Sequence, residues 1–183
     1  SKLWLAQLNL KAGKEAKKII AYESAYVYLS IASKLCGEQI WKTEPDLALK
    51  LGSELLDSTY LSNRFDEAEK YFIFLIDHIT DPVKKAELYY RKMIQYQHLS
   101  KIDNILDTGL EGLALLGMEF SPRTGRMKVL SELMKTSLML RGKTDEDLLN
   151  MPEVSDPKIR IAMSLIYKTM VFAYDRSENL MAI

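Results

Sequence analysis

Apolar residues recur along most of this chain at intervals of three and four, which is the spacing of one face of an α-helix. The clearest stretch begins at Phe65 and continues through Phe72 and Leu75 to Ile79, while charged residues fill the other side. Pro82 follows at once and suits the first turn of a further helix. No segment shows the strict alternation of a half-buried strand. The pattern therefore predicts an all-α protein.

Glycine and proline residues divide this pattern into a string of helices joined by short turns. The expected helices cover about 2–11, 14–36, 46–61, 65–79, 83–98, 102–116 and 124–141, with a short one at 144–149 and a last one from 157 to about 174. Ala12-Gly13 is the expected turn between the first two helices, and residues 37–45 are an expected connector that holds Trp41. A further break is expected at 121–125.

Three stretches of the chain repeat one packing pattern, and they begin at Tyr22, Phe65 and Ile102. Three places after each bulky apolar residue comes a residue that fits a close helix crossing. Another packing position comes four places after that second residue. These positions are Ala25 and Leu29, Ala68 and Phe72, and Ile105 and Gly109. Intervals of 43 and 37 residues predict a helical-hairpin solenoid of the tetratricopeptide type, a right-handed superhelix with degenerate repeats.

Length and composition are consistent with one helical-repeat domain over residues 1–183. We expect regular repeats to about residue 117 and irregular helices over 118–183. Twenty-five basic residues balance 25 acidic ones, so the expected partners exclude nucleic acid. No apolar run is long enough to predict membrane insertion, and the single cysteine, Cys36, favours a reducing, cytoplasmic setting. The chain opens at Ser1, which suggests a fragment of a longer protein.

Candidate catalytic chemistry is sparse in this sequence. A phosphate-binding loop needs paired glycines after a strand, and the segments around Gly13 and Gly125 lack them. Zinc needs clustered cysteine and histidine, whereas Cys36, His78 and His98 stand apart in the sequence. We therefore expect no catalytic residue, no cofactor and no metal site.

The remaining candidate is a protein-binding groove. In a tetratricopeptide hairpin the first helix faces the concave side, where a partner peptide lies. When Ala68 is placed at the small position of the repeat, that face carries eight candidate contact residues from two hairpins. They are Lys50, Ser53, Asp57, Tyr60, Glu87, Tyr90, Ile94 and Gln97. Contact of these residues with water or with neighbouring domains is an equally valid interpretation.

The order and spacing of several short motifs resemble the helical region of large bacterial signalling ATPases. The motifs lie at residues 8–17, 21–29, 41, 46–49, 54–55, 60–69, 112–117, 148–152 and 155–158. In that family a protein-kinase-like domain and a P-loop ATPase precede such helices, and a sensor with a histidine kinase or cyclase output often follows. The resemblance implies a regulatory connector that carries no enzymatic residue of the neighbouring domains.

Sequence reasoning thus predicts a non-catalytic protein-interaction and connector module of a bacterial signal-transduction protein. It would couple an ATPase or kinase-like region to a sensor or output region. The apolar residues Leu180, Met181 and Ile183 favour contact with following helices or with another copy of the chain. A free-standing peptide-binding adaptor or scaffold is the alternative, and an enzyme in its own right is a third possibility.

Overall fold

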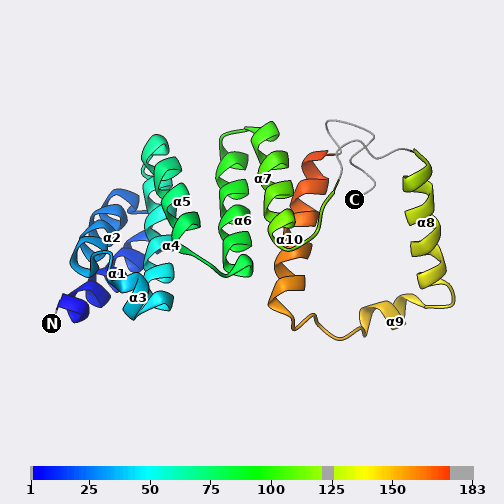
Figure 1. Ribbon diagram of the computed structural model, residues 1–183, viewed down its shortest axis with the longest axis horizontal. Coiled ribbons are helices and arrows are strands. Elements are labelled where there is room, and N and C mark those ends of the chain that lie inside the picture. The colour runs from blue at the N-terminus through cyan, green and yellow to red at the C-terminus, as the bar shows by residue number, and fades with distance from the viewer. Residues whose placement is uncertain (1, 121–125, 174–183) are drawn as a thin grey trace. The chain divides into compact units, whose positions relative to one another are not determined.

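The computed structural model describes residues 2–120 and 126–173, and this part of the chain is all-helical (Figure 1). The helices are α1 (Lys2–Lys18), α2 (Tyr22–Cys36), α3 (Ile40–Thr43), α4 (Pro45–Leu61), α5 (Phe65–His78), α6 (Pro82–His98), α7 (Ile102–Leu115), α8 (Arg126–Leu140), α9 (Asp145–Leu149) and α10 (Pro157–Ala173). The prediction of an all-α protein is confirmed for these residues. The expected break at 121–125 and the residues after 173, including Leu180, Met181 and Ile183, lie outside them.

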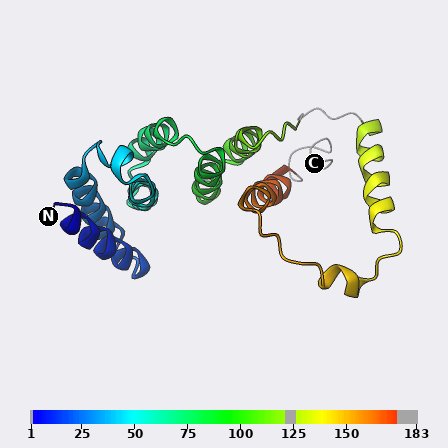
Figure 2. The same cartoon turned by 60° about the horizontal axis from the view of Figure 1, so that its bottom comes forward.

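The chain divides into two compact units, Ser1–Asp81 and Pro82–Ile183, which we call unit 1 and unit 2. In unit 1, α1 packs against α2, and α4 packs against both of them and against α3 and α5. In unit 2, α6, α7 and α10 pack against one another. Figure 2 gives a second view of the same helices. The expectation of one continuous helical-repeat domain stays a prediction.

The predicted turn at Ala12-Gly13 is wrong. Gly13 is buried in the middle of α1, and a Cβ atom added there would lie 2.6 Å from Cγ of Leu29. The glycine therefore allows a close approach of α2 and does not end the helix. The turn lies instead at Ile19–Ala21, where Ile20 has a φ of 66°.

Three helical hairpins share one turn geometry. Ile20, Asn63 and Ser100 all have positive φ angles, and each lies two residues after one helix ends and two before the next begins. In every turn this residue donates its N–H to the carbonyl three positions back, and the next residue donates to the carbonyl five positions back, which is a Schellman pair. The bonds are Ile20 to Lys17 and Ala21 to Ala16, Asn63 to Tyr60 and Arg64 to Thr59, and Ser100 to Gln97 and Lys101 to Tyr96, at 2.9–3.1 Å.

These turns recur at the intervals that the sequence pattern predicted. Ile20 and Asn63 are 43 residues apart, and Asn63 and Ser100 are 37 apart. The predicted small or packing positions Ala25, Ala68 and Ile105 are all buried. The hairpins α1–α2, α4–α5 and α6–α7 therefore share one turn geometry at these intervals, and their descent from one repeated unit stays a prediction.

The helices of each hairpin approach where a glycine faces a large side chain, and the glycine changes sides between hairpins. In two hairpins the contact joins the residue seven positions before the turn residue to the residue nine positions after it. Hairpin α1–α2 has Gly13 and then Leu29 at these positions, whereas hairpin α6–α7 has Met93 and then Gly109. A Cβ atom at Gly109 would lie 2.8 Å from Cε of Met93. In both hairpins a glycine packs against one large side chain, so a similar total volume fills the crossing while the order of the two residue types is reversed.

Hairpins α4–α5 and α6–α7 contain a second reversed pair. Gly52 faces Leu75 in the first, and Tyr89 faces Gly112 in the second, at matching distances from the turn residue. A Cβ atom at Gly52 would lie 2.6 Å from Cδ2 of Leu75. Gly109 and Gly112 also allow α10 to pack closely against α7. Side-chain atoms of Thr169 lie next to Gly109, and those of Leu165 lie next to Gly112.

Candidate functional site

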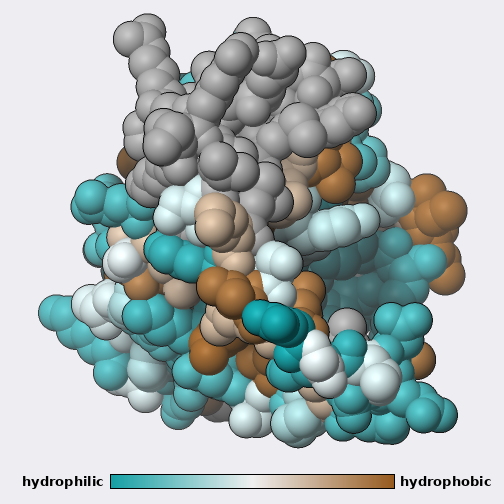
Figure 3. Space-filling view, turned by 90° about the vertical axis from the view of Figure 1, so that its right-hand side faces the viewer, coloured by the Kyte–Doolittle hydropathy of each residue, from teal (hydrophilic) through white to brown (hydrophobic). Residues whose placement is uncertain are grey.

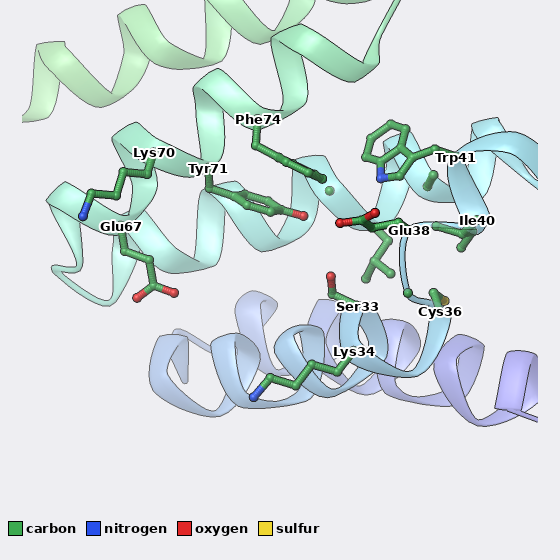
Figure 4. A pocket seen from close by; sticks show the side chains of 14 residues that line it. Ser33, Lys34, Cys36, Glu38, Ile40, Trp41, Glu67, Lys70, Tyr71 and Phe74 are labelled. Atoms are coloured by element: carbon green, nitrogen blue, oxygen red, sulfur yellow. The ribbon is translucent and has the colours of Figure 1, made fainter.

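A hollow lies within unit 1, where the C-terminal end of α2 meets α3, α4 and α5 (Figure 4). Its volume is about 430 Å³. We call it the aromatic hollow and define it by its lining residues. They are Ser33, Lys34, Cys36, Gly37, Glu38, Ile40, Trp41, Ala48, Leu51, Gly52, Glu67, Lys70, Tyr71 and Phe74. A volume of this order suits a side chain or a small ligand.

Three aromatic rings form one wall of the aromatic hollow. Tyr71 and Phe74, one turn apart on α5, stack with their centroids 5.6 Å apart and their planes inclined by only 14°. Trp41, from the short helix α3, meets Phe74 edge-on at 6.1 Å and 72°. His78 extends the row, because its ring lies 4.0 Å from Phe74 and 5.3 Å from Trp41. The wall is therefore a continuous aromatic surface with a corner at Trp41.

Tyr71 carries the strongly perturbed hydroxyl of the site. Burial raises the pKa of Tyr71 to about 12, and a hydrogen bond with Ser33 opposes this only in part. The phenol consequently stays neutral and offers a hydroxyl group at neutral pH. Burial also raises the pKa of the nearby Cys36 thiol, so this side chain is a protonated, weakly polar part of the rim.

Two carboxylates and two ammonium groups surround the opening. Glu67 accepts a hydrogen bond of 2.7 Å from the Tyr26 hydroxyl. Lys34 and Lys70 extend away from the aromatic rings, whereas Glu38 directs its carboxylate into the space between Tyr71 and Trp41 (Figure 4). Among the described residues, no ion pair involves Glu38. One carboxylate that forms no ion pair with the described residues therefore faces the aromatic wall.

Half of the eight candidate contact residues lie in unit 1, where α4 carries Lys50, Ser53, Asp57 and Tyr60. Lys50 is exposed, but Ser53 and Tyr60 are only 9% and 8% exposed, so neither lies on an open face. Asp57 is half-buried and pairs with Lys17 of α1 at 3.2 Å.

Lys17 also pairs with Glu54, which completes a small charge cluster between α1 and α4. Burial by itself would lower the pKa of Lys17, but the hydrogen bonds and charges of Glu54 and Asp57 outweigh it and raise that pKa. The carboxylate of Asp57 thus has a structural partner within unit 1 and joins two helices of the fold.

The other four candidate contact residues lie on α6 in unit 2. Glu87 and Gln97 are exposed, and Tyr90 and Ile94 are half-buried. Lys168 of α10 donates a hydrogen bond of 2.6 Å to Oε1 of Gln97 and lies 5.7 Å from the ring centroid of Tyr90. Tyr90 and Gln97 therefore contact α10 of the same unit, and Glu87 and Ile94 stay candidates for an external partner.

A second surface that no helix of the described residues covers lies on α10. One side of this helix is buried against α6 and α7, with Leu165 and Thr169 fully enclosed. The opposite side exposes a row of apolar residues at helical spacing, which we call the α10 stripe. It consists of Ile159, Met163, Tyr167, Met170 and Val171, which are between 42% and 72% exposed.

Neither the aromatic hollow nor the α10 stripe was predicted from the sequence. The aromatic hollow depends on Trp41, Glu38 and the pair Tyr71 and Phe74, which are distant in sequence and meet only through the path of the connector. The α10 stripe was visible in principle, because apolar residues at 159, 163, 167 and 170 follow a helical period.

Apolar residues also appear at the surface between polar ones in Figure 3, which looks at the molecule from the right-hand side of Figure 1. In the part of the chain that the structure describes, no group of three or more His, Cys, Asp or Glu side chains is placed to hold a metal ion. None of the described helices combines the length and the apolar character needed to cross a membrane. Comparisons with protein-family models, curated proteins and solved structures found no match for the chain.

Proposed function

We propose that this chain is a non-catalytic protein-interaction and connector module of a bacterial, cytoplasmic signal-transduction protein. It would couple an ATPase or kinase-like region to a sensor or output region through packed helix faces. In this proposal the hairpins belong to a right-handed solenoid of the tetratricopeptide type. Three hairpins with one turn geometry, at intervals of 43 and 37 residues, support this architecture.

The α10 stripe is the observation that carries the proposal. Helix α4, the first helix of its hairpin, packs against α2 of the preceding hairpin and against its own partner α5, and it is buried along most of its length. Helix α10 packs against α7 as α4 packs against α2. Its other side, where a partner helix would lie, exposes apolar residues instead. A helix that is apolar all round is stable when both of its sides are covered.

We therefore infer that the α10 stripe receives a helix from a neighbouring region of the same protein. A helix supplied in this way would join that region rigidly to unit 2. The fold-level resemblance described above agrees with such a role, although function depends on the contact surface and not on the fold.

The experiment begins with the coding sequence on both sides of residues 1–183. If it encodes further domains, their binding to this chain is measured by calorimetry, with Met163→Glu as the test variant and Ser155→Glu as the control. Both positions are exposed, and both changes add one negative charge. We expect Met163→Glu to weaken binding by at least about tenfold, because burying an unpaired carboxylate costs several kcal/mol. We expect Ser155→Glu to have little effect on binding.

Equal binding by both variants would contradict the docking of a helix on the α10 stripe. A start codon and a stop codon at the edges of the chain would exclude the connector. The alternative would then be the free-standing peptide-binding adaptor, for which the aromatic hollow is the favoured binding site.

A further inference from the structure

The aromatic hollow combines an apolar wall with one negative charge, and this combination selects for a particular kind of guest. Trp41, Tyr71 and Phe74 line the hollow with aromatic rings, and the electron-rich face of such a ring attracts a cation within about 6 Å of its centroid. Ile40 and Leu51 add aliphatic surface to the same hollow. A guest with an apolar stem and a positively charged end fits both features at once.

The charges around the opening locate the positive end of this guest. Lys34 and Lys70 belong to the lining, but their side chains extend away from the rings (Figure 4). Glu67 already accepts a hydrogen bond from Tyr26. Glu38 is the carboxylate that points toward the space beside Trp41 and Tyr71, so the guest's charge would lie there.

The shape of the wall favours a planar cation over a compact one. Tyr71 and Phe74 stack with an angle of 14° between their planes, so a planar group that lies parallel to Tyr71 is nearly parallel to both rings. A guanidinium group is planar and less strongly hydrated than an ammonium group, and its paired N–H donors match a carboxylate in bidentate geometry. It can stack on an aromatic ring while two of its N–H groups bond to Glu38, whereas an ammonium group has neither a planar face nor paired donors.

We propose that the aromatic hollow binds an arginine side chain of a protein partner, with the aliphatic stem along Ile40 and Leu51 and the guanidinium against the aromatic wall and Glu38. The inference rests on the proposed function in one respect, since it assumes that the guest belongs to a protein. It depends only on unit 1, whereas the proposed connector role depends on the α10 stripe of unit 2.

The test uses the whole chain and three small probes of nearly equal size: N-acetyl-arginine amide, its uncharged isostere N-acetyl-citrulline amide, and N-acetyl-norleucine amide. Binding is followed through the indole N–H resonance of Trp41 in ¹H–¹⁵N NMR spectra. Trp4, on α1 and outside the hollow, is the internal control. We expect the arginine probe to shift the Trp41 resonance in a saturable way and to bind at least about fivefold more tightly than the citrulline probe.

The variant Glu38→Gln should remove this preference for arginine over citrulline. Glu44→Gln is the matched control, because Glu44 is an exposed acid close in sequence that does not line the aromatic hollow. Glu38 is exposed as well, so its replacement leaves the fold intact. Loss of the preference in Glu38→Gln alone would support the proposal.

Two results would overturn the inference. If norleucine binds as tightly as arginine and Glu38→Gln changes nothing, the hollow accepts a neutral apolar side chain, and the proposed interaction function remains. If no probe shifts the Trp41 resonance, the hollow binds no such side chain. Neither result bears on the Met163→Glu experiment, so failure of this inference and failure of the connector role are distinguishable.

Discussion

Tyr71 is the residue whose surroundings most directly determine its chemistry. Its ring stacks on Phe74, and its oxygen lies near the backbone of Gly52 and bonds with Ser33. An ordinary tyrosine ionises near pH 10, and burial raises the pKa of Tyr71 to about 12. The folded protein therefore keeps a proton that the unfolded chain releases between these two values.

A loss of stability at high pH follows from this difference. The contribution of Tyr71 is complete below pH 10 and disappears as the pH rises through about 12, because the unfolded state binds fewer protons in this interval. We expect the free energy of unfolding to fall by up to about 3 kcal/mol over this range on this account. Urea unfolding of Tyr71→Phe should lack this part of the decrease, whereas Tyr28→Phe, at an exposed tyrosine, should retain it. Identical pH slopes in both variants would contradict the assignment.

Asp57 shows why burial must be known before a surface residue is tested. The sequence places it on a binding face, but its carboxylate pairs with Lys17, and Glu54 pairs with the same lysine. In Asp57→Lys two ammonium groups would meet at a half-buried position, at a cost in stability. Loss of binding in that variant would therefore report on the packing of α1 against α4 and not on a groove.

At the scale of the element, each hairpin depends on one close approach between its two helices. Hairpin α1–α2 achieves it with Gly13 against Leu29, which is fully buried. Alanine is a better helix former than glycine by about 1 kcal/mol. The clash at 2.6 Å outweighs this gain, because overpacking a tight core contact costs about 1–3 kcal/mol.

A double-mutant cycle tests this pair. We expect Gly13→Ala to destabilise the protein, Leu29→Ala to destabilise it by about 2–5 kcal/mol, and the double variant to cost less than the sum of the two. The measurement is chemical unfolding of all four proteins. A parallel cycle with Leu35→Ala, on the same helix, is the control and should be additive. If the two changes in the free energy of unfolding add in the Gly13 and Leu29 cycle, the two residues are not coupled, and this account of the contact is wrong.

The sequence was sufficient to predict the second helix of the last two hairpins. Apolar positions of helical period run through α5 without interruption, and the predicted starts at Phe65 and Ile102 agree with the structure. The predicted helix over 14–36 is wrong at its start, because α2 begins at Tyr22 and residues 14–18 belong to α1. The sequence was not sufficient to place the first turn, because a glycine used for close packing has the same appearance in sequence as a glycine used for a turn. Ile20, a β-branched residue at positive φ, gives no local signal of a turn at all.

The candidate surfaces were harder to predict for a different reason. The sequence predicts that Trp41 belongs to a connector, but it does not predict that α3 brings Trp41 against Phe74. Tyr60 has the helical register of an exposed face and is buried nonetheless. Such contacts depend on which helices pack together, and a periodicity within one helix carries no information on its neighbours.

At the scale of the whole molecule, the chain leaves the regular order of its hairpins after α7. Residues 116–156 separate α7 from α10, although these two helices pack against each other. Every side chain that the structure describes between Arg141 and Asp156 is exposed. This stretch contributes little burial, and such segments are the ones that proteases cut first.

Limited trypsin digestion should therefore cut first at Arg141 or Lys143. The two fragments should then elute together in size-exclusion chromatography, because α10 buries Leu165 and Ile161 against the remaining helices of unit 2. Leu165→Ala should make the fragments separate more readily after the same cut. Early cleavage within residues 2–115, or fragments that part at once in the unaltered protein, would contradict this description.

The different lengths of the two hairpin intervals have a consequence for how this protein could diversify. The first interval is six residues longer than the second, and most of the excess lies in Gly37–Glu44, between α2 and α4. The same insertion supplies Glu38, Ile40 and Trp41 to the aromatic hollow. Mutation or exchange of this insertion would change one side of the aromatic hollow while the hairpins keep their own glycine contacts. Changes at Gly52 would affect both, because Gly52 lines the hollow and faces Leu75. The insertion is thus the part of the hollow that can vary without altering how the hairpins pack.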